Sequence, residues 1–447
     1  MTNTKSYKKQ IHHLAWPMIL SAISFPLLGI VDTTILGHLD SPVYLGAVSI
    51  GAAAVNMLMW LFGFLRMATT GLIARSTGED DTSSTQQHLL RAVYLSLFIG
   101  ALLVILQPLI KPLMLKLLAD TGETVPLAGT YLSIRLWALP ASLLILVIVG
   151  YLVAVGRVRA VLVLTLISQV GNMVLDYIFV MHLHMYVDGV AWGSLISEYA
   201  ACMYGAFVMR NVLSDALQKH SLKSVVRNLT ALKQLLSINR DIFIRTVCLM
   251  YVFGFVTRQS ANQGDLVLAA NAVLLNFFYL ASYGLDGYAH AIESLSGRLY
   301  GARRWSDLRR AITDVFQIAF TLSLGVTLIY AVLGTTFIEW MNKLPEVRSL
   351  ANSYLIWLII NPLLAVASFV YDGICVGMTL SNTMRNSMVY ATLFGFIPLW
   401  WLLKTLAPDA HINHYLWMAF SVFFVIRGIS IHLAFRKRMQ QLQAVAA

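Results

Sequence analysis

The chain has 447 residues, of which 58% are apolar and only 12% are charged, and its mean hydropathy is +0.72. An ordinary globular domain carries about a quarter charged residues. This composition therefore excludes a cytosolic enzyme, a secreted disulfide scaffold and a disordered chain. The three cysteines, Cys202, Cys248 and Cys375, lie far apart within apolar stretches, which argues against a disulfide framework or a metal cluster. The sequence predicts a polytopic membrane protein.

Apolar runs of about 20 residues, each long enough to cross a bilayer as a helix, follow one another along the chain. The basic N-terminal segment has no small-residue cleavage site, so we expect the first span to remain as an anchor. The predicted fold is all-α with twelve transmembrane helices. Their approximate ranges are 13–36, 43–74, 90–118, 125–154, 160–182, 188–209, 238–260, 267–297, 309–335, 349–376, 386–405 and 413–435.

The basic residues predict the orientation, because cytoplasmic loops accumulate Lys and Arg. With the N-terminus inside, the inner segments hold 22 of the 32 basic residues and the outer segments hold 6. Both termini are therefore expected in the cytoplasm of a multi-pass protein of the cell's inner membrane. The net charge of +11 then needs no nucleic-acid partner. The other four basic residues lie within spans, and of these we expect Arg66 and Arg427 to snorkel toward the inner face.

A polar stretch over residues 210–237 divides the twelve spans into two sets of six. We predict an N-lobe over 1–209, a cytoplasmic linker over 210–237, and a C-lobe over 238–447 that ends in a short cytoplasmic tail. Six spans per half make the two copies parallel, as in transporters built from parallel repeats.

Matched residues support this internal repeat. At a separation of 223 residues, Arg75 matches Arg298 and Gly78 matches Gly301. With a small shift, Val155-Gly156 matches Val376-Gly377. The two lobes are therefore predicted to be pseudo-symmetric.

Carboxylates within a span are costly, and each is a functional candidate. Counting 1.5 Å of rise per residue places Asp32 and Asp176 at one depth in the outer half of the N-lobe. Tyr131, Asn172 and Ser194 fall in the same layer. The remaining acids within spans are Glu198 in the N-lobe and Asp286, Glu293 and Asp372 as second-lobe candidates.

These charges also have structural interpretations. Glu198 and Arg135 lie at similar depths and can form an ion pair. Asp286 and Glu293 can pair with Arg66, Arg245 or His290, or they can line an inner vestibule.

Pro26 lies in the middle of the first span, six residues before Asp32. It removes the helical hydrogen bond to the carbonyl of Ala22, so it predicts a bend point that is either static or moving.

Several segments resemble the multidrug and toxic compound extrusion (MATE) family, and its DNA-damage-inducible-F-like branch in particular. They are VDTTILGHLDSPVYLGAVSIGAA, FGFLRMATTGLIARSTG, GNMVLDYIFV with GVAWGSLISE, LAANAVLLNF and LDGYAHAIESLSGRLYGA. The resemblance implies two six-helix bundles that form a V around a central cavity, and export of organic cations driven by an ion gradient.

The same resemblance implies residue roles. Asp32 matches the proton-coupling acid of prokaryotic relatives, and Tyr131, Asn172 and Asp176 match its polar partners. Ser194 stands where a Thr is common. Asp372 matches a second-lobe acid of sodium-coupled relatives, although the seventh span lacks the carboxylate that those relatives carry there.

We therefore predict a proton-coupled antiporter of cationic amphiphilic compounds that works by alternating access. Protonation of Asp32, which shares a proton with Asp176, is expected to bend the first helix at Pro26. We expect small organic cations and the lipid bilayer as partners, a monomer, no bound metal, and no cofactor other than the proton gradient.

Three alternatives stay open. A sodium-coupled antiporter would use Asp372. A flippase for lipids or lipid-linked sugars would need several basic residues in its cavity, and in the N-lobe only Arg135 is deep enough. A membrane-embedded enzyme is disfavoured, because the closely spaced His pairs have no acid in a matching span.

Overall fold

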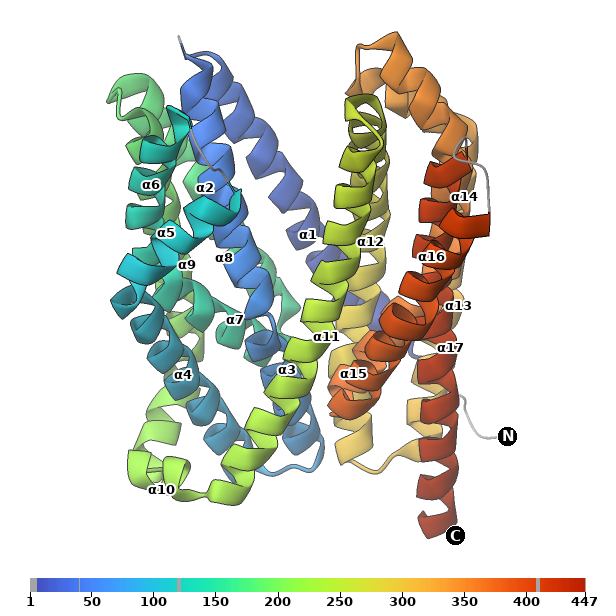
Figure 1. Cartoon of the computed structure of the whole chain (residues 1–447). Coiled ribbons are helices and arrows are strands. Elements are labelled where there is room, and N and C mark those ends of the chain that lie inside the picture. The colour runs from blue at the N-terminus through green and yellow to red at the C-terminus, as the bar shows by residue number, and fades with distance from the viewer. Residues whose placement is uncertain (1–5, 40, 119–121, 407–410, 447) are drawn as a thin grey trace. The chain divides into compact units, whose positions relative to one another are not determined.

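The computed structural model describes residues 6–39, 41–118, 122–406 and 411–446, and the regular structure of these residues is helical throughout (Figure 1). The α-helices are α1 (Lys8–Gly37), α2 (Pro42–Leu61), α3 (Phe64–Gly78), α4 (Thr82–Ile105), α5 (Gln107–Leu118), α6 (Thr124–Arg135), α7 (Leu139–Ala154), α8 (Val158–Tyr177), α9 (Tyr186–Lys219), α10 (Leu222–Arg227), α11 (Leu229–Asn262), α12 (Asp265–Gly301), α13 (Trp305–Met341), α14 (Pro345–Gly377), α15 (Ser381–Tyr390), α16 (Ile397–Leu406) and α17 (Ile412–Ala446).

The predicted all-α polytopic fold is confirmed. Ten helical segments among the described residues are long and apolar enough to cross a membrane. The other two predicted spans lie in α9 and α11, which are 34 residues long but carry more charge. Some spans that hydropathy predicts as continuous are interrupted. One of them changes to a 3-10 turn at Leu136–Ala138, just before Pro140, whose ring cannot continue the α-helical hydrogen bonds.

Two compact units divide the chain. The N-unit comprises Leu20–Asn239, and the C-unit comprises the chain up to Ile19 together with the chain from Arg240 onward. This division differs from the predicted lobes in two respects. The first half of α1 packs with the C-unit, and the predicted linker is mostly helical, because it extends α9, forms α10 and begins α11.

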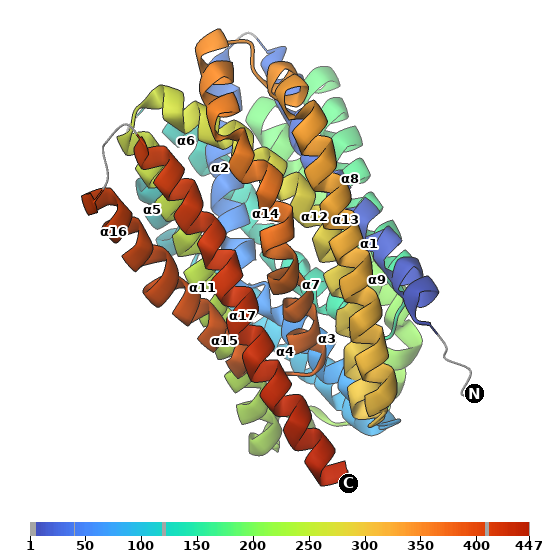
Figure 2. The ribbon, with the colours of Figure 1, turned by 90° about the vertical axis from the view of Figure 1, so that its right-hand side faces the viewer.

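Within each unit, one helix has neighbours on several sides. In the N-unit, α7 contacts α3, α4 and α9, while α8 lies along α9. In the C-unit, α14 packs against α12, α13 and α17, as Figure 2 shows.

The first half of α1 is fixed to the C-unit by polar and packing contacts. The backbone N–H of Tyr7 donates to Asp314 Oδ2 at 2.7 Å, and His12 Nδ1 lies 3.1 Å from the Tyr288 hydroxyl. Gly287 permits close packing, because a Cβ there would lie 2.2 Å from Ile19 Cγ1. This half of α1 is therefore a structural part of the C-unit.

Four helices end in the same backbone motif. After the last residues of α3, α7, α12 and α14, the second residue has a positive φ of 53° to 78°; these residues are Asp80, Gly156, Arg303 and Thr379. The next N–H then donates to the carbonyl five residues earlier, for example from Leu380 to Cys375 at 2.7 Å. This is the Schellman arrangement, which pairs the otherwise free carbonyls of a helix end.

These motifs test the register of the internal repeat. Gly78 and Gly301 both end their helices, and Arg75 and Arg298 both lie in the last turn, so this match is confirmed. The match of Gly156 with Gly377 is wrong by two residues. Gly156 occupies the positive-φ position, and its structural counterpart is Thr379.

The β-branched Thr379 pays a steric cost for its left-handed conformation, because its Cβ approaches the neighbouring carbonyl. We expect Thr379→Gly to raise the free energy of unfolding by about 1 kcal/mol. Detergent-solubilised protein titrated with sodium dodecyl sulfate measures this change. Thr379→Ala, which keeps the Cβ, is the matched control. A glycine variant no more stable than the alanine variant would contradict the assignment.

Candidate functional site

The centre of the candidate site is a hydrogen-bonded set on α8 and α9. Asn172 and Asp176 are one turn apart on α8, so they share a helix face. The Asn172 amide nitrogen donates to Asp176 Oδ1 at 3.1 Å and to Ser194 Oγ at 3.1 Å. Asp176 is completely buried and Asn172 nearly so. The structure thus brings together three of the residues that the sequence places in one layer.

Asp32, on the second half of α1, joins this set. Its carboxyl group lies close enough to that of Asp176 for the two to interact directly. Among the described residues, Asp32 Oδ1 and Asp176 Oδ2 are both buried without a hydrogen-bond donor. Two neighbouring carboxylates in such a place repel each other, and a proton between them or a nearby cation would relieve the repulsion. The pair can therefore take up positive charge.

Two glycines let the surrounding helices approach this layer closely. A Cβ at Gly193 would lie 2.1 Å from Asp176 Oδ1, so the backbone of α9 touches the carboxyl group. A Cβ at Gly51 would lie 2.2 Å from the Tyr131 ring, which is buried against α2. Neither glycine was predictable as a site residue from the sequence, because small residues are common at helix interfaces throughout membrane proteins.

Apolar side chains and an irregular turn complete the surroundings. Tyr131 belongs to a buried apolar cluster, whose other members include Ile35 and Leu36, one turn after Asp32 on α1. Immediately after Asp176, α8 widens into a π-helical turn over Ile178–His182. Such turns are frequent at functional sites, where they re-aim neighbouring side chains.

Arg135 and Glu198 form the ion pair that the sequence analysis allowed. Arg135 Nη2 donates to Glu198 Oε1 at 2.7 Å, and the Ser142 hydroxyl donates to Glu198 Oε2. Arg135 is buried and interacts electrostatically with both Asp32 and Asp176. The polar layer therefore has a permanently protonated group beside it.

Asp372 on α14 has very different surroundings. Arg245 on α11 donates to Asp372 Oδ2 at 2.5 Å, and Arg427 on α17 donates to the same oxygen. The prediction that Arg427 snorkels is wrong, because this residue is only 2% exposed. It lies near the middle of α17, which continues to Ala446, so its side chain is too far from the helix end to reach water. Two guanidinium groups already neutralise the Asp372 carboxylate.

The other two second-lobe candidates lie on α12. Glu293 is buried, and its Oε1 lies 3.3 Å from His290 Nδ1. Asp286 is half-buried two turns earlier on the same helix. Both belong to the C-unit, whereas the Asp32 layer belongs to the N-unit.

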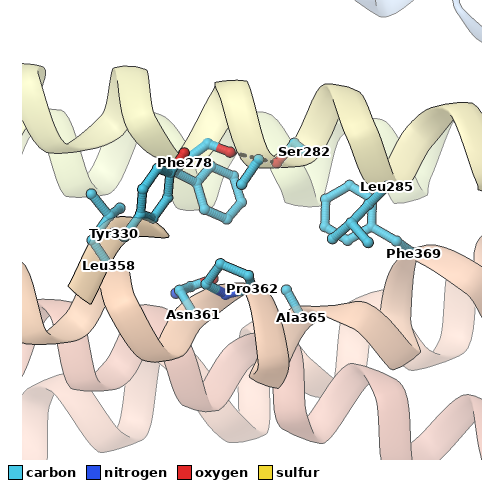
Figure 3. A pocket seen from close by; sticks show the side chains of 10 residues that line it. Phe278, Ser282, Leu285, Tyr330, Leu358, Asn361, Pro362, Ala365 and Phe369 are labelled. Carbon is cyan, nitrogen blue, oxygen red and sulfur yellow. Dashed lines mark hydrogen bonds between the residues drawn. The ribbon is translucent and has the colours of Figure 1, made fainter. Parts of the chain in front are cut away.

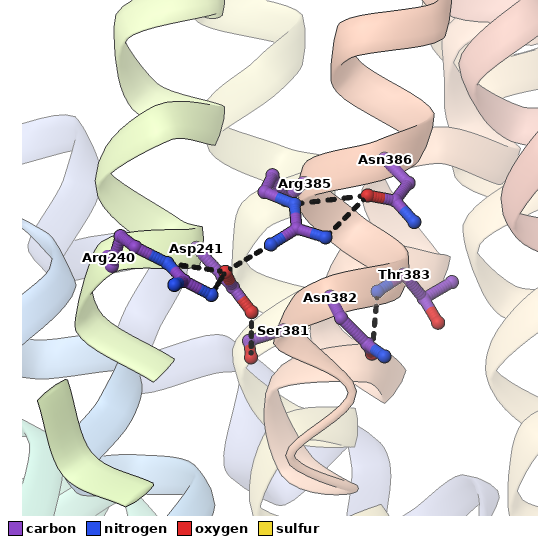
Figure 4. Close-up of polar contacts among 7 residues, drawn as sticks. All are labelled: Arg240, Asp241, Ser381, Asn382, Thr383, Arg385 and Asn386. Carbon is purple, nitrogen blue, oxygen red and sulfur yellow. Dashed lines mark hydrogen bonds and ion pairs between the residues drawn. The ribbon is translucent and has the colours of Figure 1, made fainter. Parts of the chain in front are cut away.

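A further carboxylate of the C-unit, Asp241, ties α11 to α15 (Figure 4). Arg385 Nη1 donates to Asp241 Oδ1 at 2.7 Å, and Ser381 Oγ donates to Oδ2 at 3.1 Å. Arg240 Nη2 lies 3.0 Å from Oδ1. This buried carboxylate is saturated with donors, which makes it a structural contact.

A small cavity lies between α12, α13 and α14 in the C-unit, beside Pro362 (Figure 3). Its volume is about 10 Å³, about the space that one water molecule needs. It cannot hold an organic substrate. Among the described residues, no group of three or more His, Cys, Asp or Glu side chains is arranged to hold a metal ion.

The different surroundings of Asp32 and Asp372 predict opposite effects of neutralisation on stability. Asp372→Asn leaves buried Arg427 and half-buried Arg245 without their shared anion, which costs about 3–5 kcal/mol of unfolding free energy. Asp32→Asn removes a charge that lacks donors, so we expect no loss. Titration of both purified variants with sodium dodecyl sulfate measures the difference. An equal loss of unfolding free energy in the two variants would contradict the predicted difference between Asp372 and Asp32.

Comparison with known proteins agrees with this fold. The MatE family model matches residues 17–178 and 243–401. The DNA damage-inducible protein F of Escherichia coli (strain K12) is 38% identical over 433 residues, which cover 97% of this chain and 93% of that protein. A probable multidrug resistance protein NorM of Acinetobacter baylyi is 26% identical over 309 residues, or 67% of this chain and 68% of that protein.

A solved structure has the same fold. It is described as the outward-facing conformation of a multidrug resistance MATE family transporter of the MOP superfamily. The two superpose with a TM-score of 0.88 at 20% identity, over 98% of this chain and 97% of the other. This likeness shows the fold, and the family model together with the 38% identical relative establishes that this polytopic chain belongs to the MatE family.

Proposed function

We propose that this transporter exports cationic amphiphilic compounds in exchange for protons, as a monomer of the cell's inner membrane with both termini in the cytoplasm. The observation that carries the proposal is the pair of half-buried Asp32 and buried Asp176, which has oxygens without donors and Asn172 and Ser194 beside it. The NorM relative, named as a probable multidrug resistance protein, supports drug export in general.

In the proposed cycle, proton and substrate compete for the same carboxyl pair. When both carboxyl groups are ionised, they attract an organic cation into the apolar surroundings of the layer. A proton that arrives from outside neutralises Asp32 and lets it donate a hydrogen bond to Asp176. The attraction for the cation is then lost, and the cation leaves outward. Proton uptake and cation export are then coupled, because binding of a proton to the carboxyl pair lowers the affinity of the pair for the cation.

Helix α1 supplies the proposed conformational change. Its first half is held by Tyr7, His12 and Ile19 in the C-unit, and its second half carries Asp32 in the N-unit. Between them, the side chains of residues 25–30 are exposed or half-buried, and Pro26 interrupts the hydrogen bonds of this stretch. Bending there breaks few packing contacts, so a change in hydrogen bonding at Asp32 can move the helix.

The proton gradient is sufficient for this work. A one-for-one exchange of a proton for a monovalent cation moves no net charge, so the pH difference drives it; each pH unit supplies about 1.4 kcal/mol, which sustains roughly a tenfold substrate gradient.

The surroundings of Asp372 favour protons over sodium as the coupling ion. A sodium ion at Asp372 would have to displace Arg245 and Arg427, both of which already bind its Oδ2. For the flippase alternative, the N-unit offers Arg135, which is bound to Glu198 and so is not arranged for a pyrophosphate.

Efflux of ethidium from proteoliposomes tests the coupling, with pH and sodium gradients imposed separately. We expect efflux to follow the pH gradient, and Asp32→Asn to abolish it because the pair can no longer release and regain a proton. Asp188→Asn, which replaces a half-buried acid at the start of α9, is the matched control and should retain efflux. Proton-driven efflux by Asp32→Asn would refute the assignment, and efflux driven only by sodium would favour the sodium alternative.

Pro26→Ala tests the bend. The alanine restores the hydrogen bond to the Ala22 carbonyl, so we expect slower transport with little change in cation affinity. Stopped-flow efflux measures the rate, and equilibrium binding measures the affinity. Pro17→Ala, in the half of α1 that is fixed to the C-unit, should leave the rate unchanged. If Pro26→Ala transports at the wild-type rate, the bend is only structural.

A further inference from the structure

Arg135 is a buried cation whose hydrogen-bonding capacity is largely unused. It ends α6, immediately before the 3-10 turn, and it is 7% exposed. Its Nη2 binds Glu198, but Nε and Nη1 are buried and donate no hydrogen bond that meets normal geometry within the described residues. A guanidinium carries five N–H donors, and buried donors without acceptors are costly.

The unused acceptors of the same unit are on the acid pair. Asp32 Oδ1 and Asp176 Oδ2 are buried without donors, and both carboxyl groups lie within electrostatic range of Arg135. Tyr131, one turn before Arg135 on α6, interacts with the same guanidinium. Besides its contacts with Glu198 and Tyr131, the guanidinium therefore has a second set of acceptors within electrostatic range, the carboxyl groups of Asp32 and Asp176.

Glu198 holds Arg135 away from that pair. Its carboxylate binds Arg135 through Oε1 and is itself fixed through Oε2 by the Ser142 hydroxyl of α7. One guanidinium therefore interacts with three carboxyl groups, in direct contact with Glu198 and through its electric field with Asp32 and Asp176. Arg135 can reduce the excess negative charge at only one of the two places at a time.

We propose that Arg135 is a built-in competitor of the cationic substrate, whose guanidinium exchanges between Glu198 and the Asp32–Asp176 pair. This inference rests on the proposed function, because it concerns the occupancy of the same carboxyl pair. When a cation or a proton occupies the pair, Arg135 stays on Glu198. When the pair is empty, the guanidinium moves to it.

The exchange gives Arg135 a role in specificity. A tethered cation competes at a high effective concentration, so only a substrate that binds the pair well displaces it. It also prevents the empty pair from keeping two uncompensated charges in the membrane. Arg135 is thus a positioning residue for the acid pair, with Glu198 and Ser142 setting how often it moves.

Binding of tritiated tetraphenylphosphonium to purified protein at pH 8.5 tests the proposal without any gradient. Glu198→Gln frees the guanidinium, so we expect the Kd to rise about tenfold or more, because a substrate must then break a charged hydrogen bond. The double variant Arg135→Gln/Glu198→Gln removes the competitor at unchanged net charge and should restore near wild-type affinity. A Kd that is unchanged or lower in Glu198→Gln, or a double variant that stays as weak as Glu198→Gln, would overturn the proposal.

Two further measurements distinguish the proposed exchange from two other causes of weaker binding, namely a misfolded variant and a long-range effect of the changed charge. Ser142→Ala only loosens Glu198 and should raise the Kd in the same direction but by less; no rise would count against the proposal. A structure of Glu198→Gln should place the guanidinium within hydrogen-bond distance of Asp32 or Asp176. A guanidinium that remains beside residue 198 would refute the exchange.

The outcomes separate this inference from the proposed function. If Asp32→Asn loses proton-driven efflux while Glu198→Gln binds normally, the transport proposal stands and the competitor is refuted. If wild-type protein binds no tetraphenylphosphonium, the cationic substrate class is contradicted, and this inference is overturned with it.

Discussion

The cost of keeping ionised carboxyl groups away from water governs this structure. A buried carboxylate needs donors, a fixed cation or a proton, and the two units meet this need differently. In the C-unit, arginines bind both Asp372 and Asp241, and a serine hydroxyl also donates to Asp241. Both charges are therefore compensated, although Asp372 Oδ1 itself has no donor among the described residues. In the N-unit, the Asp32–Asp176 pair keeps two oxygens without donors. The same requirement therefore produces structural contacts in one unit and a site able to take up a proton or a cation in the other.

This asymmetry arises within a shared backbone plan. Equivalent helices of the two units end in the same Schellman motif, and both units contain a π-helical stretch, over Ile178–His182 in one and Ala391–Phe396 in the other. The backbone is thus repeated while the buried charges are not. One copy of the repeat thus has its buried carboxylates bound by arginines, while the other contains the carboxyl pair on which the proposed function depends.

Much of this was predictable from the sequence, for identifiable reasons. Hydropathy predicts the spans, because a bilayer requires a minimum apolar length, and the fixed helical rise places Asn172 and Asp176 beside Ser194. The division of α1 between the units and the burial of Arg427 were not predictable. Both depend on which helices pack together and on where a long helix ends, and neither leaves a periodic signal. The contact between Gly193 and Asp176 was not predictable either, because the sequence does not show which neighbour a glycine packs against.

The sharing of α1 limits how the protein can be divided experimentally. The polar segment between α9 and α11 looks like a natural place to separate two halves. A fragment that begins there, however, would lack the helical turns that cover Gly287 and that provide the backbone N–H bound to Asp314. Its apolar surface on α12 would be left uncovered. Co-expressed halves should therefore reassemble better when the first half of α1 is supplied to the C-terminal fragment, either in the same polypeptide or as a separate peptide.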